Sequence, residues 1–159
     1  AGLPGDIVLD PALNAKCQQA ALMMHKERQL SHGPPASWGC YTADGAEAAA
    51  NSNIALAPGP LAIIGYISEP DAEGSNNPEV GHRRLILYPP QKTMGMGNVA
   101  VAGIFFSQGA NTLWVKAPEG ERPANPEFVA WPPPGFVPPG ARNCATASPA
   151  GPGAIAYAL

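Results

Sequence analysis

The apolar positions in the first part of the chain follow a helical period. Asp10 and Pro11 suit a helix N-cap and the first helical position, and Lys26 and Arg28 suit the C-terminal end. Between them, apolar residues recur three or four positions apart, at Leu13, Cys17, Ala20, Ala21 and Met24. The pattern predicts a helix from about 11 to 30, because the Gly and Pro residues after position 32 prevent its continuation.

Three further helices are predicted before position 90. The Ala-rich residues 43–56 predict a second helix, which prolines follow. The short apolar run 60–68 fits either a helix or a strand, and its leading proline favours a helix. Residues 79–88 predict a short last helix that two prolines end, and residues 69–78 before it predict an exposed acidic loop.

The pattern changes after position 92. Residues 93–118 contain glycines, β-branched residues and aromatics, and they predict two or three antiparallel strands with a hairpin turn near 107–111. Helices followed by strands indicate an α+β domain rather than alternating β-α-β units.

The last part of the chain is rich in proline. Residues 118–152 contain ten prolines, which predicts a polyproline II-like segment. Its large aromatic residues could anchor it on the domain, or the segment could link to another module; these residues are Phe128, Trp131 and Phe136. We therefore divide the chain into a domain of residues 1–117 and a Pro-rich tail of residues 118–159.

Composition and charge narrow the classes of function. Only 13% of the residues are charged and the net charge is −3, so no global field attracts nucleic acid or anionic membranes. The longest apolar run, roughly residues 99–106, is too short to span a bilayer, which takes about 20 residues. No signal peptide is visible and the chain begins without Met, which fits a processed secreted protein or an excised fragment.

Four polar side chains beside the predicted turns are candidates for a functional site. They are His32 after the first helix, Glu47 on the second, Glu69 after the third and His82 at the start of the fourth. Imidazole and carboxylate groups together suit zinc or a similar divalent ion, and they also serve as acid and base without a metal. The chain contains no P-loop, Rossmann glycine fingerprint, HExxH or GxSxG motif.

The order of several short motifs resembles the CAP superfamily, which groups cysteine-rich secretory proteins, insect antigen 5 and plant pathogenesis-related class 1 proteins. The resemblance covers roughly residues 5–117, and GHR in place of GHYTQ looks like the bacterial SCP-like type. The matching pieces are "LDPALNAKCQQAALMM", "SH", "NSNIALAPG" against the family's "GENIAxG", "GYISEP" against its "W-x-x-E", "GHRRLIL" against its "GHR" segment, and "TMGMGNV" against its "vGvG" strand.

The resemblance implies an α-β-α sandwich, with a central antiparallel sheet flanked by helices, in a protein that is secreted or held at the cell surface. It also implies a cavity of two histidines and two acids, sometimes occupied by a divalent cation such as zinc. On this basis His32 and His82 take the histidine positions. Glu69 takes the acidic position after the aromatic residue, here Tyr66.

One position departs from the family pattern. Aligning "NSNIA" with "GENIA" places Ser52 where the family has a glutamate. The nearest acid upstream is Glu47, which on a straight helix is rotated by about 140° from Ser52. Ser52 is therefore a candidate cavity residue. The candidate metal ligands are His32, His82, Glu69 and, as the fourth, Glu47.

These inferences favour a binding module with a His/acid cavity over an enzyme. Its ligand would be a small apolar or lipid molecule, a cell-wall component or a protein partner. The alternative is a peptidase-like or zinc-dependent hydrolase that uses His32 and His82 as base and acid. Its nucleophile would be Ser31, Ser52 or a zinc-bound water. A third hypothesis makes the domain a scaffold, with the minimal P-x-x-P motif of residues 123–126 as the interaction element.

The three cysteines match no zinc spacing. Cys17 and Cys40 bracket the first helix and its exit loop, which favours a disulfide between them. Such a bond would close a loop of about 24 residues and stabilise the fold by roughly 3 kcal/mol. Cys144 would then lack a partner in this sequence, and a fully reduced chain with three unrelated thiols is the alternative.

Overall fold

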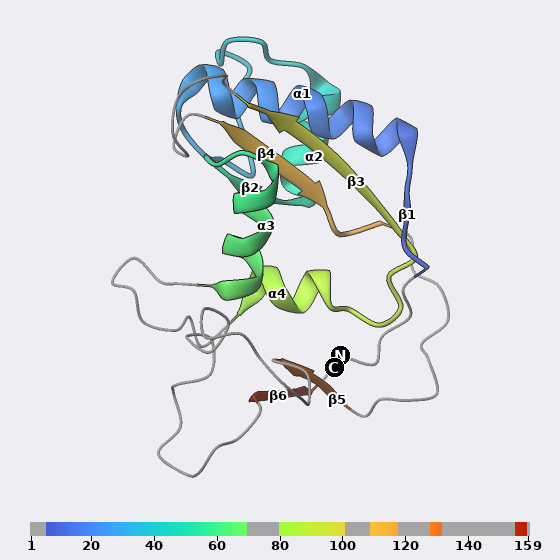
Figure 1. Ribbon diagram of the computed structural model, residues 1–159. Coiled ribbons are helices and arrows are strands. Elements are labelled where there is room, and N and C mark those ends of the chain that lie inside the picture. Colours follow the sequence, from blue (N-terminus) through green and yellow to red (C-terminus); the bar gives the residue numbers. More distant parts are fainter. Residues whose placement is uncertain (1–5, 70–79, 101–108, 118–127, 132–154, 159) are drawn as a thin grey trace.

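The computed structural model describes residues 6–69, 80–100, 109–117, 128–131 and 155–158 (Figure 1). The helices are α1 (Pro11–Glu27), α2 (Ala43–Ala50), α3 (Gly59–Ser68) and α4 (Gly81–Ile86). The strands are β1 (Val8–Leu9), β2 (Ser52–Ala55), β3 (Thr93–Val99), β4 (Ala110–Trp114), β5 (Phe128–Trp131) and β6 (Ile155–Ala158). These helices and strands confirm the predicted α+β class. Within the described ranges, no helix is both long enough and apolar enough to cross a membrane.

Helix α1 begins and ends where local chemistry requires. The Asp10 carboxylate accepts hydrogen bonds from the backbone N–H groups of Ala12 and Leu13, at 2.7 and 2.9 Å. At the other end, Arg28 takes a left-handed backbone conformation with φ 55°. The helix therefore stops at Glu27, slightly before the end predicted near position 30.

Four strands form one mixed sheet in the order β1-β3-β4-β2. β4 pairs antiparallel with both β2 and β3. Of the turn predicted near 107–111, residues 107–108 lie outside the described residues, and Ala110 and Asn111 already belong to β4. β1 instead runs parallel to β3, so the expectation of a wholly antiparallel sheet is wrong at this edge. The long connection through α1, α2, β2, α3 and α4 explains this direction, because parallel neighbours need a crossover rather than a hairpin.

The predicted helix over residues 43–56 is wrong beyond position 50. Helix α2 ends at Ala50, and Ser52–Ala55 form β2, in which Ile54 is opposite Thr112 of β4. The side chains of β4 are all buried, so its backbone groups need partners from neighbouring strands. Pairing with β4 therefore overrides the helical preference of the Ala-rich sequence.

Helices cover both faces of the sheet (Figure 1). On one face, alanines, methionines and Cys17 from α1 and α2 pack with Ile54 and Trp114. On the other face, Tyr66 of α3 packs with Leu113, and partly buried residues of α4 lie against this second cluster. Leu113 and Trp114 are neighbours in β4, and their opposite directions separate the two cores. This arrangement agrees with the α-β-α sandwich that the resemblance implies.

Two glycines of β3 let α1 lie directly on the sheet. A Cβ atom at Gly97 would lie 2.1 Å from the backbone carbonyl carbon of Cys17. One at Gly95 would lie 2.5 Å from the Cβ of Leu13. Real Cβ atoms essentially never approach other atoms closer than 3.0 Å, so these glycines set the distance between helix and strand.

Side chains of α1 replace a neighbouring strand along the later part of β3. β1 pairs with only the first two residues of β3. Beyond them, Oδ1 of Asn14 accepts the N–H of Met96 at 2.7 Å. Gln18 accepts the N–H of Asn98 at 2.9 Å and donates to its carbonyl oxygen at 3.1 Å. These bonds satisfy backbone groups that an open sheet edge would leave to solvent or to another chain.

β5 and β6 form a separate two-stranded antiparallel sheet. The expectation of polyproline II structure over residues 118–152 is therefore wrong for residues 128–131, which form β5. Phe128 and Trp131 lie in this strand, whereas Phe136 lies outside the described residues. The boundary between the domain and the tail stays a prediction.

Candidate functional site

Helix α3 carries the first candidate side chain at its C-terminal end. The N-cap residue of α3 has no side-chain hydrogen bond, and Oδ1 of Asn98 in β3 accepts the Gly59 N–H at 2.6 Å instead. The inner face of α3 buries Tyr66 in the second core. Glu69 follows the last helical residue with a left-handed φ of 50°. These contacts fix α3 on the sheet and direct Glu69 toward α4.

The Glu69 carboxylate is buried between α3 and α4, with 2% of its side chain exposed. Oε2 lies 3.0 Å from Nδ1 of His82, and Oε1 accepts the backbone N–H of Arg83 at 2.8 Å. Val80 occupies the N-cap of α4 without a side-chain cap, so Glu69 provides a capping oxygen from outside the helix. Burial by itself would raise the pKa of Glu69, but the hydrogen bonds from His82 and Arg83 outweigh burial and lower that pKa.

Both the side chain and the backbone of His82 are held by neighbouring residues. Besides Glu69, the ring of Tyr66 stacks on the imidazole, with centroids 5.3 Å apart and an interplanar angle of 27°. The side-chain amide of Asn53 in β2 donates to the His82 carbonyl oxygen at 3.1 Å. The His82 side chain is nevertheless 42% exposed. The fold therefore presents an oriented imidazole at the surface.

A buried polar network holds Tyr66 in turn. Its hydroxyl lies 3.2 Å from both the carbonyl oxygen and Oδ1 of Asn111, and it donates to them. The Asn111 amide donates to the carbonyl oxygen of Gly97 at 3.2 Å. Burial raises the pKa of Tyr66, so its hydroxyl stays protonated at neutral pH and acts as a donor. The network connects the candidate site to the centre of the sheet.

Two residues with a left-handed backbone conformation flank the site. Glu69 and Val80 have φ values of 50° and 43°. Such values are uncommon outside glycine, and they are outliers for a β-branched residue such as valine. Strain of this kind costs on the order of 1–3 kcal/mol per residue and is concentrated at functional sites. Glu69 takes this conformation as the C-cap of α3, as Arg28 does for α1, so Val80 is the residue whose backbone indicates strain beside the Glu69–His82 pair. The connecting residues 70–79 lie outside the described part of the chain.

A comparison with protein families identifies the family to which these features belong. The family described as CAP, the cysteine-rich secretory protein family, matches residues 2–115. The chain belongs to this family. Searches of curated proteins and of solved structures gave no match. The matched residues run from before β1 to the end of β4, so they include the whole Glu69–His82 site of this CAP domain.

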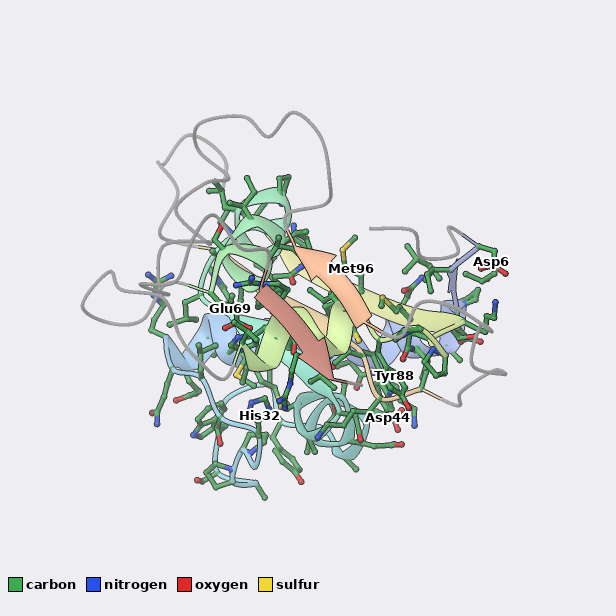
Figure 2. All side chains as sticks on the ribbon, turned by 90° about the horizontal axis from the view of Figure 1, so that it is seen from below. Asp6, His32, Asp44, Glu69, Tyr88 and Met96 are labelled. Atoms are coloured by element: carbon green, nitrogen blue, oxygen red, sulfur yellow. The ribbon has the colours of Figure 1, made fainter. Side chains whose placement is uncertain are left out.

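His32, the other histidine of the candidate cavity, lies in the loop between α1 and α2 of the CAP domain (Figure 2). Its Nδ1 lies 2.7 Å from the carbonyl oxygen of Ala49 and donates a hydrogen bond to it, because a carbonyl only accepts. This bond satisfies one of the last carbonyls of α2. The structure thus brings Tyr66, Glu69 and His82 into contact, and it gives His32 a structural bond to α2.

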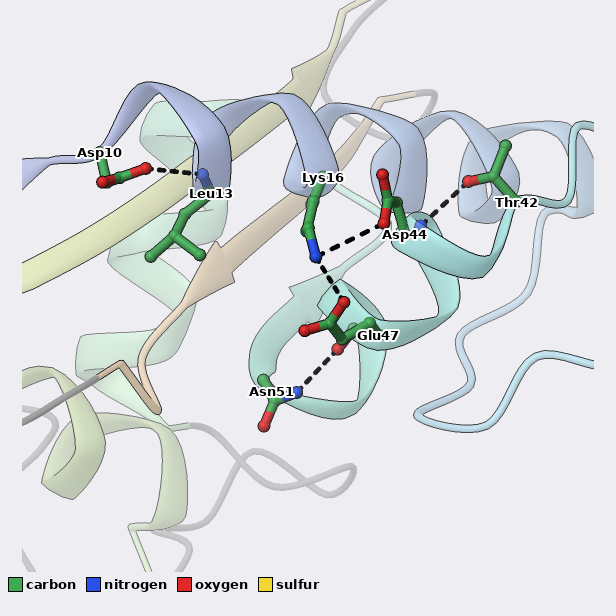
Figure 3. Close-up of polar contacts among 8 residues, drawn as sticks. Asp10, Leu13, Lys16, Thr42, Asp44, Glu47 and Asn51 are labelled. Atoms are coloured by element: carbon green, nitrogen blue, oxygen red, sulfur yellow. Dashed lines mark hydrogen bonds and ion pairs between the residues drawn. The ribbon is translucent and has the colours of Figure 1, made fainter.

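Glu47, the fourth candidate metal ligand, takes part in an ion pair between α1 and α2. Nζ of Lys16 lies 2.5 Å from Oε2 of Glu47 and 3.4 Å from Oδ1 of Asp44 (Figure 3). The Glu47 side chain is half exposed. Its visible role is therefore to hold α2 against α1 rather than to complete the Glu69–His82 site.

Ser52, the residue at the family's glutamate position, is buried on the sheet face under α1. Its hydroxyl lies 4.0 Å from Sγ of Cys17. Asn53, the next residue of β2, has the opposite direction and reaches His82. The sequence interpretation missed Asn53 and Asn111. Their signal is an amide inside a strand sequence of otherwise small and apolar residues, because a buried amide requires hydrogen-bond partners.

The predicted disulfide between Cys17 and Cys40 is wrong, because both cysteines are free. Cys17 lies on the inner face of α1 and is completely buried, whereas Cys40 is exposed in the exit loop. Desolvation by burial raises the pKa of the Cys17 thiol, so the thiol is protonated and unreactive at neutral pH. Cys144 lies outside the described residues.

The described residues of this CAP domain do not fit a zinc ion. Among them, no group of three or more His, Cys, Asp or Glu side chains could hold a metal. Glu69 already uses one oxygen for His82 and the other for Arg83. Protein zinc sites take at least three protein ligands, and the Glu69–His82 pair supplies only two. Zinc binding stays a prediction.

Proposed function

We propose that this CAP domain is a secreted binding module whose ligand contacts the His82 imidazole. The observation that carries the proposal is the contrast within one hydrogen-bonded pair. The Glu69 side chain is 2% exposed and the His82 side chain is 42% exposed. A buried carboxylate that orients an accessible imidazole is a preorganised recognition group, because its geometry is fixed before the ligand arrives.

The contacts of the two candidate serines favour binding over hydrolysis. Oγ of Ser31 accepts the N–H of Gly33 at 3.1 Å, and the hydroxyl of Ser52 lies beside Cys17. Within the described residues, neither serine hydroxyl forms a hydrogen bond with a histidine. A serine nucleophile needs a base within hydrogen-bond reach, so nothing on these residues supports the hydrolase alternative.

A ligand screen with a matched variant tests the proposal. Backbone amide NMR spectra would be recorded with a fatty acid, a sterol and a peptidoglycan fragment, which represent the apolar, lipid and cell-wall classes. We expect at least one class to shift the resonances of α3 and α4, with affinity at least tenfold weaker in His82→Ala. The control is His25→Ala, on α1. Equal affinity in the wild type and His82→Ala would contradict the proposal.

Secretion is a separate part of the proposal and has its own test. The family's description as secretory supports it. The natural protein would be detected by antibody in the culture medium and in washed cells of its source. Retention of all detectable protein inside the cells would contradict secretion without bearing on the His82 site.

A further inference from the structure

We infer that Glu69 is a positioning residue that fixes His82 in one tautomer, with the proton on Nδ1 and the lone pair on Nε2. The site would therefore recognise a ligand group that donates a hydrogen bond, such as a hydroxyl or a protonated amine. The ligand part of this inference rests on the proposed function, whereas the tautomer part rests on the geometry alone.

The first step concerns the direction of the bond between Glu69 and His82. The Glu69 carboxyl group has a backbone N–H in front of Oε1 and a ring nitrogen in front of Oε2, which is the arrangement of an ionised carboxylate, and an ionised carboxylate only accepts hydrogen bonds. Its Oε1 already accepts from the N–H of Arg83. Nδ1 of His82, 3.0 Å from Oε2, must therefore be the donor. In a neutral imidazole a protonated Nδ1 leaves Nε2 as an acceptor.

The second step concerns which edge of the ring is accessible. Nδ1 faces a carboxylate that is 2% exposed, and one ring face lies against buried Tyr66. The Asn53 bond to the His82 carbonyl fixes the backbone that carries the ring. The 42% exposure of the side chain must then come from the edge and face that these partners leave uncovered. Within the described residues, Nε2 makes no hydrogen bond, so it is the polar atom presented to a ligand.

The third step concerns the chemistry of the ligand. A neutral imidazole in front of an ionised carboxylate offers a lone pair rather than a positive charge. Hydroxyl and ammonium groups match this acceptor, whereas a carboxylate or phosphate group would face a lone pair with another lone pair. The hydrogen-bond donor class is thus favoured over the anionic class.

Nitrogen NMR of the histidine side chains tests the tautomer directly. At about pH 8, where an ordinary imidazole is neutral, we expect wild-type His82 to show a protonated Nδ1 and an unprotonated Nε2. Glu69→Gln places an amide beside Nδ1, and this amide can donate, so we expect the proton to move toward Nε2. The isosteric control Glu47→Gln removes an exposed carboxylate from α2 and should leave His82 unchanged.

The same spectra supply the outcomes that overturn the inference. A wild-type His82 with its proton on Nε2 would overturn it, and so would an unchanged tautomer in a folded Glu69→Gln variant. Thermal unfolding followed by circular dichroism establishes whether that variant is folded. If it does not fold, the wild-type spectrum alone decides the tautomer.

Three probes with the same eight-carbon chain test the ligand class: n-octanol, octylammonium and octanoate. We expect n-octanol or octylammonium to shift Nε2 of His82, and octanoate to bind at least tenfold more weakly. Comparison of the first two separates a hydroxyl from a cation. His82→Phe keeps a ring to stack on Tyr66 but lacks Nε2, so it should lose this preference.

Failure of the inference and failure of the proposed function give different results. Octanoate binding at His82 as tightly as n-octanol would overturn the donor class and leave the binding site intact. If none of the three probes shifts His82, the ligand part and the proposed site are both contradicted. The nitrogen spectra still decide the role of Glu69 in that case.

Discussion

The two faces of the sheet are built from different kinds of contact. Under α1 and α2, the core consists of alanine, methionine, cysteine and tryptophan side chains, and the helix backbone lies directly on Gly97. Under α3 and α4, apolar residues surround a series of polar contacts. This series runs from Asn111 through Tyr66 and His82 to Glu69.

The difference separates the residues that fix the fold from those that build the site. Close packing on the α1 face leaves little room for rearrangement. On the α3 face, hydrogen bonds replace part of the packing, and Val80 has a strained backbone. Because stability is a property of the whole domain, a closely packed face can offset strain on the other one. Substitutions on each face test this division.

The largest effect is expected from Gly97→Ala on the α1 face. The new Cβ would lie 2.1 Å from the Cys17 carbonyl carbon, and backbone atoms of a packed helix cannot move aside cheaply. We expect the free energy of unfolding, measured by urea titration, to fall by about 3 kcal/mol or more. A loss below about 1 kcal/mol would show that α1 is not held as closely as the contact implies.

Gly65→Ala is the matched control on the α3 face. A Cβ at Gly65 would meet nothing within 4 Å, and the residue lies inside α3. Alanine favours a helix over glycine by roughly 0.5–1 kcal/mol, so this variant should be as stable as the wild type or slightly more stable. The opposite signs of the two glycine substitutions are the sharpest form of the comparison.

Tyr66→Phe should give the next largest effect. It removes the hydroxyl that donates to Asn111 in the buried network but keeps the ring that stacks on His82. Leaving buried acceptors unsatisfied costs about 1–3 kcal/mol, so we expect a loss near 2 kcal/mol by urea titration. The control Tyr41→Phe removes a hydroxyl without a hydrogen bond to any described residue and should change stability by less than about 0.5 kcal/mol. If Tyr66→Phe and Tyr41→Phe lowered the free energy of unfolding equally, the hydrogen bonds from Tyr66 to Asn111 would not contribute to stability as predicted.

The elements that the sequence predicts correctly have local signals. The start of α1 is specified by Asp10 ahead of Pro11 and by the spacing of apolar residues behind them. Residues 52–55 lack such a signal. They form a strand because β4 lies beside them, and no pattern within an Ala-rich segment reveals that neighbour.

The residues of the candidate site also differ in whether the sequence carries a local signal for them. Tyr66, Glu69 and His82 lie in motifs that resemble the family, and the structure places them in contact. The partner of Glu47 comes from a different helix, so sequence spacing could not identify it. The free state of Cys17 and Cys40 depends on which of them faces the core, and loop length carries no information about that.

Glu69→Gln should weaken the α3 face in a pH-dependent way. The pKa of Glu69 is lowered in the folded protein, so its charge stabilises the fold above the ordinary carboxyl pKa of about 4.3. This contribution is lost as the pH falls through the lowered pKa. We expect a loss of about 1 kcal/mol at neutral pH, because a neutral amide replaces a charged acceptor. The gap between wild type and variant should then close toward pH 3, measured by urea titration. A gap that stays constant with pH would contradict this prediction.

The smallest effect is expected from Glu47→Gln, which lies outside both cores. It breaks the ion pair with Lys16, whose partners Glu47 and Asp44 are about half exposed. Water and salt screen such pairs, so we expect a small decrease in the urea midpoint at low salt and none at about 0.5 M salt. A large decrease in the urea midpoint that persists in high salt would show that the ion pair, and not the apolar core alone, stabilises the contact between α1 and α2. The closely packed face would then depend on charge, and the contrast with the α3 face would be weaker than the buried contacts indicate.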